Sequence, residues 1–237
     1  MKNKIKKLEG HTNHLLNGVI VLKEKYAIFE PLIFNKNVIA AYGHKERNQG
    51  FGIIKNTLLF SCIQDIAKFC MDSDKDKRTP SIKSLTKELT DAQLIAYFRE
   101  NYAIRPMIYS EDEKDPLLQE ALRSIADHEN IKRGNEFDHH LKNLKSISVK
   151  LFDSKLMNSF QIIRDKVIAH TESRLVNNEY KVVDINTLGI KWKDIKLIIE
   201  EMQKATDLIN FIIRRAGYDW DNLDKQLATA STNFWRI

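Results

Sequence analysis

Apolar residues recur every three or four positions along most of this 237-residue chain. That spacing places them on one face of an α-helix, whereas strand-like alternation is limited to a short segment. Glycine and proline, the residues that interrupt helices, number 8 and 4. The sequence therefore predicts an all-α fold, and a hydrophobic content of 43% is enough to fill its core.

Three long helices are predicted in the first half of the chain. The first covers about residues 12–34 and stops or kinks near Pro31, because proline interrupts a helix interior. Its apolar face consists of Val19, Leu22, Tyr26 and Phe29. The second covers about residues 38–69, with a middle loosened by Gly50 and Gly52. The third covers about residues 82–102 and is capped by Ser81 or Ser84, after the solvated loop MDSDKDKRTPS.

The second half is predicted to hold three more helices and one irregular segment. A helix over about residues 117–150 is open to interruption at Gly134, and the next helix begins at Asp153 or Ser154. That next helix is expected to be central, with an apolar stripe made of Leu156, Phe160, Ile163 and Val167. Residues 171–189 include the alternating run YKVVDI and form a loop or a short hairpin.

The last long helix is predicted to start near Lys191 and to end at Gly217. Its stripe consists of Trp192, Ile195, Ile198, Met202, Ala205, Ile209, Ile212 and Ala216. The tail over residues 217–237 either docks on the bundle or frays. We expect residues 1–237 to form a single helical domain, with a core over about residues 40–216 and with residues 12–34 and 217–237 as additions.

Composition narrows the classes of protein to which the chain can belong. Cys62 and Cys70 form neither a disulfide framework nor a zinc-binding pattern, which fits a reducing cytosol. The N-terminal run MKNKIKKLEGHTNHLL predicts neither a signal peptide nor a membrane span, so we expect a cytoplasmic location. The 38 Lys and Arg residues against 32 Asp and Glu give a net charge of +6. That charge favours a polyanionic partner, or simply reflects a solvated surface.

Arg164 and His170 are the strongest candidates for chemistry. Projected at about 100° per residue, they lie on opposite flanks of the apolar stripe of their helix. An arginine there needs an acceptor for its donors, and a histidine there titrates near neutral pH, so the pair suits a phosphate. The alternative is structural: Arg164 forms a salt bridge to another helix, and His170 caps the last carbonyl groups.

The segment FQIIRDKVIAH resembles the signature of the HEPN superfamily, in which an arginine, a polar residue and then a histidine lie on the penultimate core helix. Arg164, Asp165 and His170 match it, with five residues between arginine and histidine. The flanking segments AYGHKERNQGFGIIKNTLLFSCIQDIAKFCMD, TPSIKSL and LGIKWKDIKLIIEEMQKATDLINFI are similar to the abortive-infection AbiU-type branch, so the resemblance covers about residues 40–211. Thr171 and Glu172 follow His170, so the tyrosine that one HEPN toxin branch has two residues after the histidine is absent.

The resemblance implies a HEPN-like helical bundle that pairs as a homodimer, with two motifs in one cleft. Many HEPN proteins cut RNA without metal, as toxins or phage-defence effectors, and others only bind. For this chain it implies an endoribonuclease that needs no metal or cofactor, in which His170 acts as base or acid and Arg164 stabilises the charged phosphorane. Asp165 faces the partner chain, orients a histidine across the interface, or stays solvated.

Other charged groups are weaker candidates. Lys45, Arg47 and Lys166 are candidate RNA contacts, with a solvated helix face as the alternative. The run DHENIKRGNEFDHH matches no established metal pattern, so no metal site is predicted there. The residues of that run that could bind a metal are Asp127, His128, Glu129, Asp138, His139 and His140.

Two non-enzymatic functions stay open beside the ribonuclease. One is a HEPN module that binds RNA without cutting it, and the other is an antitoxin or scaffold that binds another protein. A cognate antitoxin protein is a further candidate partner for a catalytic chain. Cleavage of RNA in the presence of a chelator separates the enzyme from both alternatives.

Overall fold

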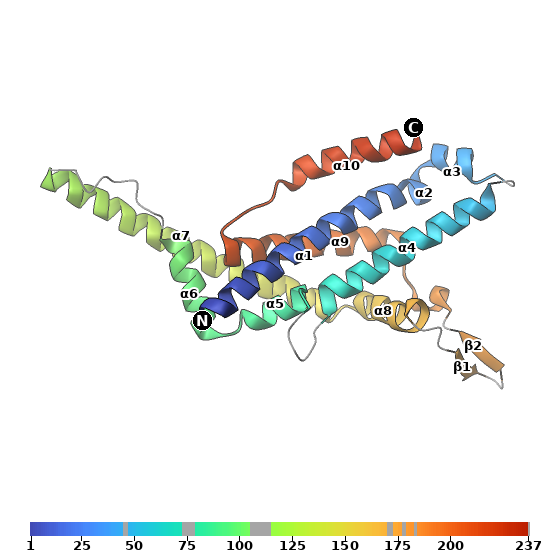
Figure 1. The fold of residues 1–237 in the computed structure, drawn as a ribbon, viewed down its shortest axis with the longest axis horizontal. Helices are drawn as coiled ribbons and strands as arrows, with labels where there is room; N and C mark the ends of the chain where they lie inside the picture. Colours follow the sequence, from blue (N-terminus) through green and yellow to red (C-terminus); the bar gives the residue numbers. More distant parts are fainter. Residues whose placement is uncertain are drawn as a thin grey trace.

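The computed structural model describes residues 1–44, 47–72, 79–104, 115–169, 173–176, 179–182 and 184–236. These residues are almost entirely helical, which confirms the predicted all-α fold (Figure 1). The helices are α1 (Lys2–Phe29), α2 (Pro31–Phe34), α3 (Lys36–Tyr42), α4 (Asn48–Met71), α5 (Ile82–Glu88), α6 (Ala92–Ala103), α7 (Pro116–Phe152), α8 (Lys155–Ile163), α9 (Trp192–Arg214) and α10 (Trp220–Trp235). Between α8 and α9 lie a π-helical turn η1 (Arg164–Ile168), an antiparallel hairpin of β1 (Ser173–Val176) and β2 (Glu179–Val182), and a 3-10 turn η2 (Ile185–Leu188). The hairpin is therefore one of the two alternatives that the sequence left open.

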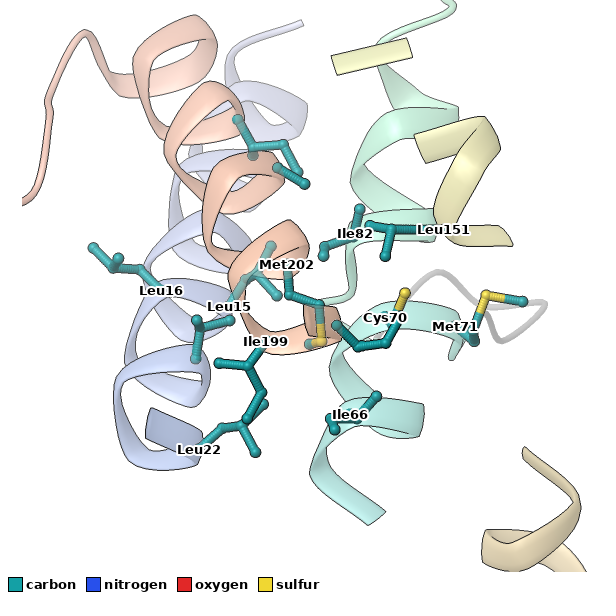
Figure 2. Close-up of a cluster of buried hydrophobic side chains, with 14 of the residues drawn as sticks. Leu15, Leu16, Leu22, Ile66, Cys70, Met71, Ile82, Leu151, Ile199 and Met202 are labelled. Atoms are coloured by element: carbon teal, nitrogen blue, oxygen red, sulfur yellow. The ribbon is translucent and has the colours of Figure 1, made fainter. Parts of the chain in front are cut away.

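The bundle is built around α1, α4 and α9, which pack against one another (Figure 1). The helices α5, α7 and α8 pack on the same core, and α10 lies along α1. Their buried side chains form one hydrophobic cluster. Figure 2 shows the part near the end of α4, where Cys70, Ile82, Leu151 and Met202 come together from four helices. The end of α4 is therefore packed against α5, α7 and α9.

The helix α1 is longer than predicted. It begins at Lys2 rather than near residue 12, because Ile5 and Leu8 extend its apolar face into the core. It ends at Phe29, and Pro31 opens the short α2, where its missing N–H breaks no helical hydrogen bond. The four residues predicted for its core are all buried, namely Val19, Leu22, Tyr26 and Phe29.

The helix predicted over about residues 38–69 is two helices, which corrects that expectation. The first, α3, ends at Tyr42 with Gly43 as its C-cap, and α4 begins at Asn48. Gly50 and Gly52 lie inside the first turns of α4 and do not interrupt it. A Cβ at either position would meet open space, so packing does not require glycine there.

The helix predicted over about residues 82–102 is also divided. Ser81 caps α5 by accepting a hydrogen bond from the Ser84 N–H at 3.1 Å, and the Ser84 hydroxyl accepts one from the Ser81 N–H at 3.0 Å. After Glu88 the chain turns, and Asp91 caps α6 by accepting from the Gln93 N–H at 2.9 Å. Asp91 is an ordinary N-cap residue in the sequence, so the break had a local signal.

Gly134 does not interrupt α7; it makes room for a side chain of α6. A Cβ at Gly134 would lie 2.9 Å from Nη2 of Arg99. Arg99 binds the carboxylate of Asp138 through Nε and Nη2, each at 3.0 Å from one oxygen. The glycine therefore serves the contact between α6 and α7, and the first half of α7 extends away from the bundle (Figure 1).

The C-terminal segment docks on the bundle, which decides between the two predicted alternatives. Arg215, in the left-handed conformation with φ 56°, closes α9 before Gly217 is reached, which corrects the predicted end. In α10 the Ser231 hydroxyl donates to the Ala27 carbonyl at 2.7 Å, and Trp235 Nε1 donates to the Ile28 carbonyl at 3.1 Å. The two ends of the predicted α9 stripe, Trp192 and Ala216, are not buried.

Candidate functional site

Arg164 and Asp165 of the motif directly follow α8, a helix that packs on α4. Ser154 starts it, because its hydroxyl oxygen accepts from the Met157 N–H at 3.1 Å. The fully buried residues of α8 are Met157, Phe160 and Ile163. Leu156 and Val167, which the sequence placed in the same stripe, are half-buried. The buried face therefore holds α8 firmly while its end reaches the surface.

Beyond Ile163 the helix widens into the π turn η1. The Ala169 N–H donates to the Arg164 carbonyl at 2.8 Å, a hydrogen bond across five residues instead of four. The projection at about 100° per residue applies to an α-helix, so it no longer holds after Arg164. The expectation that Arg164 and His170 lie on opposite flanks of one stripe stays a prediction, because His170 lies outside the described residues. Single π turns within helices are frequent at functional sites.

Arg164 is held between two carboxylates. Its Nε donates to Oδ1 of Asp165 at 2.8 Å, and its Nη1 donates to Oδ1 of Asp72. Asp165 belongs to the same turn, whereas Asp72 follows the end of α4. The Arg164 side chain is 23% exposed, so it is neither buried nor extended into bulk water. The guanidinium is thus fixed against the bundle and partly accessible.

The two carboxylates also determine the electrostatics of the site. Burial by itself would lower the pKa of Arg164, but the hydrogen bonds with Asp165 and Asp72 outweigh it and raise that pKa. The guanidinium therefore stays protonated. One cation between two carboxylates leaves a net negative charge, so a phosphate has to compete with Asp72 or Asp165 for guanidinium N–H groups.

Asp72 is the site residue that the sequence reading missed. The sequence predicts a solvated loop there, but the Asp72 backbone N–H donates to the Lys68 carbonyl at 3.3 Å, and the Asp72 carbonyl accepts from the Ser81 hydroxyl. Ser81 is fully buried, so these contacts anchor Asp72 between α4 and α5. The sequence offered one signal for Asp72, namely that it is the first residue after a helix with an apolar stripe. Nothing local indicated that its partner would be Arg164.

The other predicted site residues fall in different places. His170 and Lys45 lie outside the described residues. Lys166 is half-buried in η1, two positions after Arg164. Arg47 is exposed just before α4, a helix of 24 residues and therefore about 36 Å long. Because Arg164 contacts Asp72, the residue after the other end of α4, the structure separates Arg47 from Arg164.

The histidine-rich part of α7 makes packing and surface contacts. Across the described residues, no group of three or more His, Cys, Asp or Glu could hold a metal ion. Asp138 binds Arg99, and His139 Nε2 lies 2.9 Å from Asn143 Nδ2. The His140 ring stacks on Phe211 of α9, with centroids 5.5 Å apart and planes at 10°. Asp138 thus connects α7 to α6 and His140 connects it to α9, whereas the His139 contact stays within α7.

A family model matches nearly the whole chain: HEPN_AbiU2, described as AbiU2, covers residues 5–234. The chain belongs to the HEPN AbiU2 family. No curated protein and no solved structure matches it. The match to the AbiU2 family begins in α1 and ends in α10, so it extends well beyond the region in which the sequence resemblance lay.

Membership in the AbiU2 family points to an HEPN-type function of the abortive-infection kind. The α1 and α10 helices, expected as additions to a core, are part of what the family model matches. In the part of the chain that the structure describes, no helix is long and apolar enough to cross a membrane.

Proposed function

We propose that this AbiU2-family chain is a metal-independent endoribonuclease of the abortive-infection or toxin type, acting as a cytosolic homodimer. One observation carries the proposal: the Arg164 guanidinium is held at the end of α8 by Asp72 and Asp165 and stays partly accessible. His170 completes the same sequence motif. A fixed cation and a histidine are the groups that transesterification of RNA requires.

In the proposed reaction the 2′-oxygen of RNA attacks the adjacent phosphorus while a base accepts its proton. The bond from phosphorus to the 5′-oxygen of the next nucleotide breaks, and an acid donates a proton to that oxygen. The products are a 2′,3′-cyclic phosphate and a 5′-hydroxyl end. Arg164 stabilises the negative charge that builds up on the phosphate oxygens. The two His170 side chains of a dimer divide the base and acid roles, so dimerisation is part of the mechanism.

Asp72 and Asp165 are positioning residues in this proposal. They bind different nitrogen atoms of the guanidinium, so together they fix the direction in which its fork points. Asp72 directly follows α4, so its contact also makes the position of Arg164 depend on the packing of the bundle. The same two carboxylates repel an approaching phosphate. They therefore orient the Arg164 guanidinium but lower its affinity for the phosphate of RNA.

The test is RNA cleavage in EDTA by wild type and by His170→Ala, with structured and single-stranded RNA as substrates. We expect wild type to cut and the variant to be about 100-fold slower or worse, because removal of a general acid or base costs that much. His128→Ala, on the exposed surface of α7, is the matched control and should cut like wild type. Equal cleavage by His170→Ala, or complete loss of wild-type cleavage in EDTA, contradicts the proposal.

The contact between Arg164 and Asp72 also favours a second function. An arginine that joins the end of α4 to η1 is a sufficient structural contact in itself. On that reading the chain is a non-catalytic HEPN module that binds RNA, or an antitoxin or scaffold that binds a protein. Salt-sensitive RNA binding by wild type without cleavage supports the RNA module. Recovery of a stoichiometric protein without nucleic acid supports the antitoxin or scaffold.

A further inference from the structure

A groove near the start of α4 is lined by aromatic and apolar residues, which the proposed ribonuclease site does not use. Its volume is about 310 Å³, and α2, α3, the first turns of α4 and the end of α10 contribute to its walls. Leu32 and Trp235 are its buried residues, and Tyr42 and Phe51 are half-buried. Three aromatic rings from three different helices therefore face one small space.

The aromatic surface is held rigidly. Trp235 is fixed by the hydrogen bond from its Nε1 to the Ile28 carbonyl at 3.1 Å. The Tyr42 ring packs edge to face on the Trp235 ring, with centroids 5.5 Å apart and planes at 66°. A ligand that stacks here would meet rings that are already ordered, so little conformational entropy is lost on binding.

An arginine supplies charge at the groove. Arg47 is exposed, and among the described residues that line the groove it is the charged one. Ile54, 49% exposed, also lines the groove. Aromatic rings that share a groove with an exposed arginine are complementary to a flat ring that carries an anion. At about 310 Å³ the groove is at the small end for ligand sites, with room for one such ring and none for a helix.

We propose that this groove binds one base of a single-stranded RNA, with the adjoining phosphate against Arg47. This inference takes one element from the proposed ribonuclease function, namely that the ligand is RNA. Because α4 is about 36 Å long, the groove holds the strand far from Arg164 and serves as an anchor for the substrate. The base stacks on the half-buried rings, and this contact is sequence-tolerant because every base has such a face.

The test is binding of a labelled single-stranded RNA oligonucleotide, measured by fluorescence anisotropy with the full chain in EDTA. We expect Phe51→Leu, which keeps the apolar volume but removes the ring, to weaken binding about fivefold or more. Arg47→Ala should weaken it similarly and lower the slope of log Kd against log salt by about one. Lys36→Ala and Ile53→Ala are matched controls: both residues are exposed nearby, neither lines the groove, and both variants should bind within about twofold of wild type.

A second measurement uses the tryptophan in the groove. Titration with AMP should quench part of the fluorescence of wild type and less of that of Trp235→Phe, since the Trp235 indole lies in the wall of the groove beside the bound base. If wild type binds RNA, the groove variants weaken that binding, and no RNA is cut, the groove inference stands and the proposed ribonuclease is contradicted. If RNA is cut but Arg47→Ala and Phe51→Leu leave RNA binding unchanged, the groove inference is contradicted and the proposed ribonuclease stands. Groove variants that change only the oligomeric state would show a protein contact and overturn the inference.

Discussion

The guanidinium of Arg164 is shared between a carboxylate of its own turn and one from a different helix, and this sharing defines what the site can do. Asp165 alone could follow the side chain as it moves, whereas Asp72 is anchored by backbone contacts to α4 and α5. The anchored partner therefore sets the direction of the fork. In the proposed enzyme it also adds negative charge where the phosphate of RNA would bind.

Asp72→Asn separates these two effects. The amide still offers an oxygen to Arg164 but removes the charge, so RNA should bind more tightly than to wild type. The fork is held less firmly, so kcat should fall about tenfold, a change of about 1.4 kcal/mol in the barrier. Steady-state kinetics and RNA binding measure the two effects. Asp153→Asn, at an exposed acidic residue just before α8, is the control. Parallel loss of binding and of kcat would contradict a positioning role.

At this scale the sequence predicted the members of the motif but not their surroundings. The order of Arg164 and Asp165 is visible in eleven letters, FQIIRDKVIAH. Asp72 is separated from Arg164 by 92 positions, and no local pattern connects them. The π turn was equally hidden, because its apolar residues are spaced as in an ordinary helix.

At the scale of elements, α1 illustrates how close two helices of the bundle approach. Gly18 lies under the ring of Phe69 from α4, and a Cβ there would be 2.3 Å from Cζ of that ring. A side chain at Gly18 therefore forces the ring out of the contact. Gly10, in the same helix, has nothing within 4 Å of an added Cβ.

Substitution of these two glycines by alanine should therefore have opposite effects. Gly10→Ala should raise the free energy of unfolding by about 0.5–1 kcal/mol, because glycine is the poorer helix former. Gly18→Ala gains the same propensity but should lower the free energy of unfolding by about 1–3 kcal/mol, because it overpacks the contact between α1 and α4. Urea unfolding followed by circular dichroism gives both values. Two variants shifted in the same direction would show that α1 and α4 are packed differently.

The contact between α7 and α9 should make stability depend on pH. Burial against Phe211 lowers the pKa of His140 below its usual value, against the opposing effect of the Glu136 carboxylate. The unfolded chain then binds the proton more readily, so this residue lowers the free energy of unfolding as the pH falls through about 6.5. His140→Phe keeps the stacked ring and cannot titrate. Between pH 8 and pH 5, wild type should lose more stability than the variant, and equal losses would exclude a role for His140.

Element positions were predicted well where apolar spacing was long and regular, and poorly at short breaks. The apolar stripe of α9 predicted most of the residues that the structure buries there. The breaks near Gly43 and Asp91 were missed, because apolar residues on both sides continue the same period while the caps consist of single polar or small residues. The first turns of α1 were missed because lysines surround Ile5 and Leu8.

At the scale of the whole molecule, we propose that residues 1–237 form a single domain. The buried residues of α1, α4, α5, α7, α8, α9 and α10 belong to one cluster, and α10 is bonded to α1 across more than two hundred positions of sequence. Far-UV circular dichroism and tryptophan fluorescence should therefore report one cooperative thermal transition with a shared Tm. Two separate transitions would show that part of the chain, such as the projecting half of α7, folds independently.

The fold class and the family could be predicted from the sequence because both depend on periodicity and on one compact motif. The arrangement of helices could not, since it is set by contacts between residues far apart in the chain, such as Ser231 with Ala27 and Arg164 with Asp72. The groove at the start of α4 is likewise visible only after α3 and α10 are placed beside each other.

Arg164→Lys isolates the role of the guanidinium in the proposed enzyme. Lysine keeps the positive charge, but it lacks the planar fork that binds Asp72 and Asp165 while presenting further N–H groups to a phosphate. In single-turnover cleavage of RNA in EDTA, we expect this variant to be about 100-fold slower than wild type or worse, with a Tm within a few degrees of wild type. A folded Arg164→Lys protein that cuts RNA at the wild-type rate would contradict the role given to Arg164.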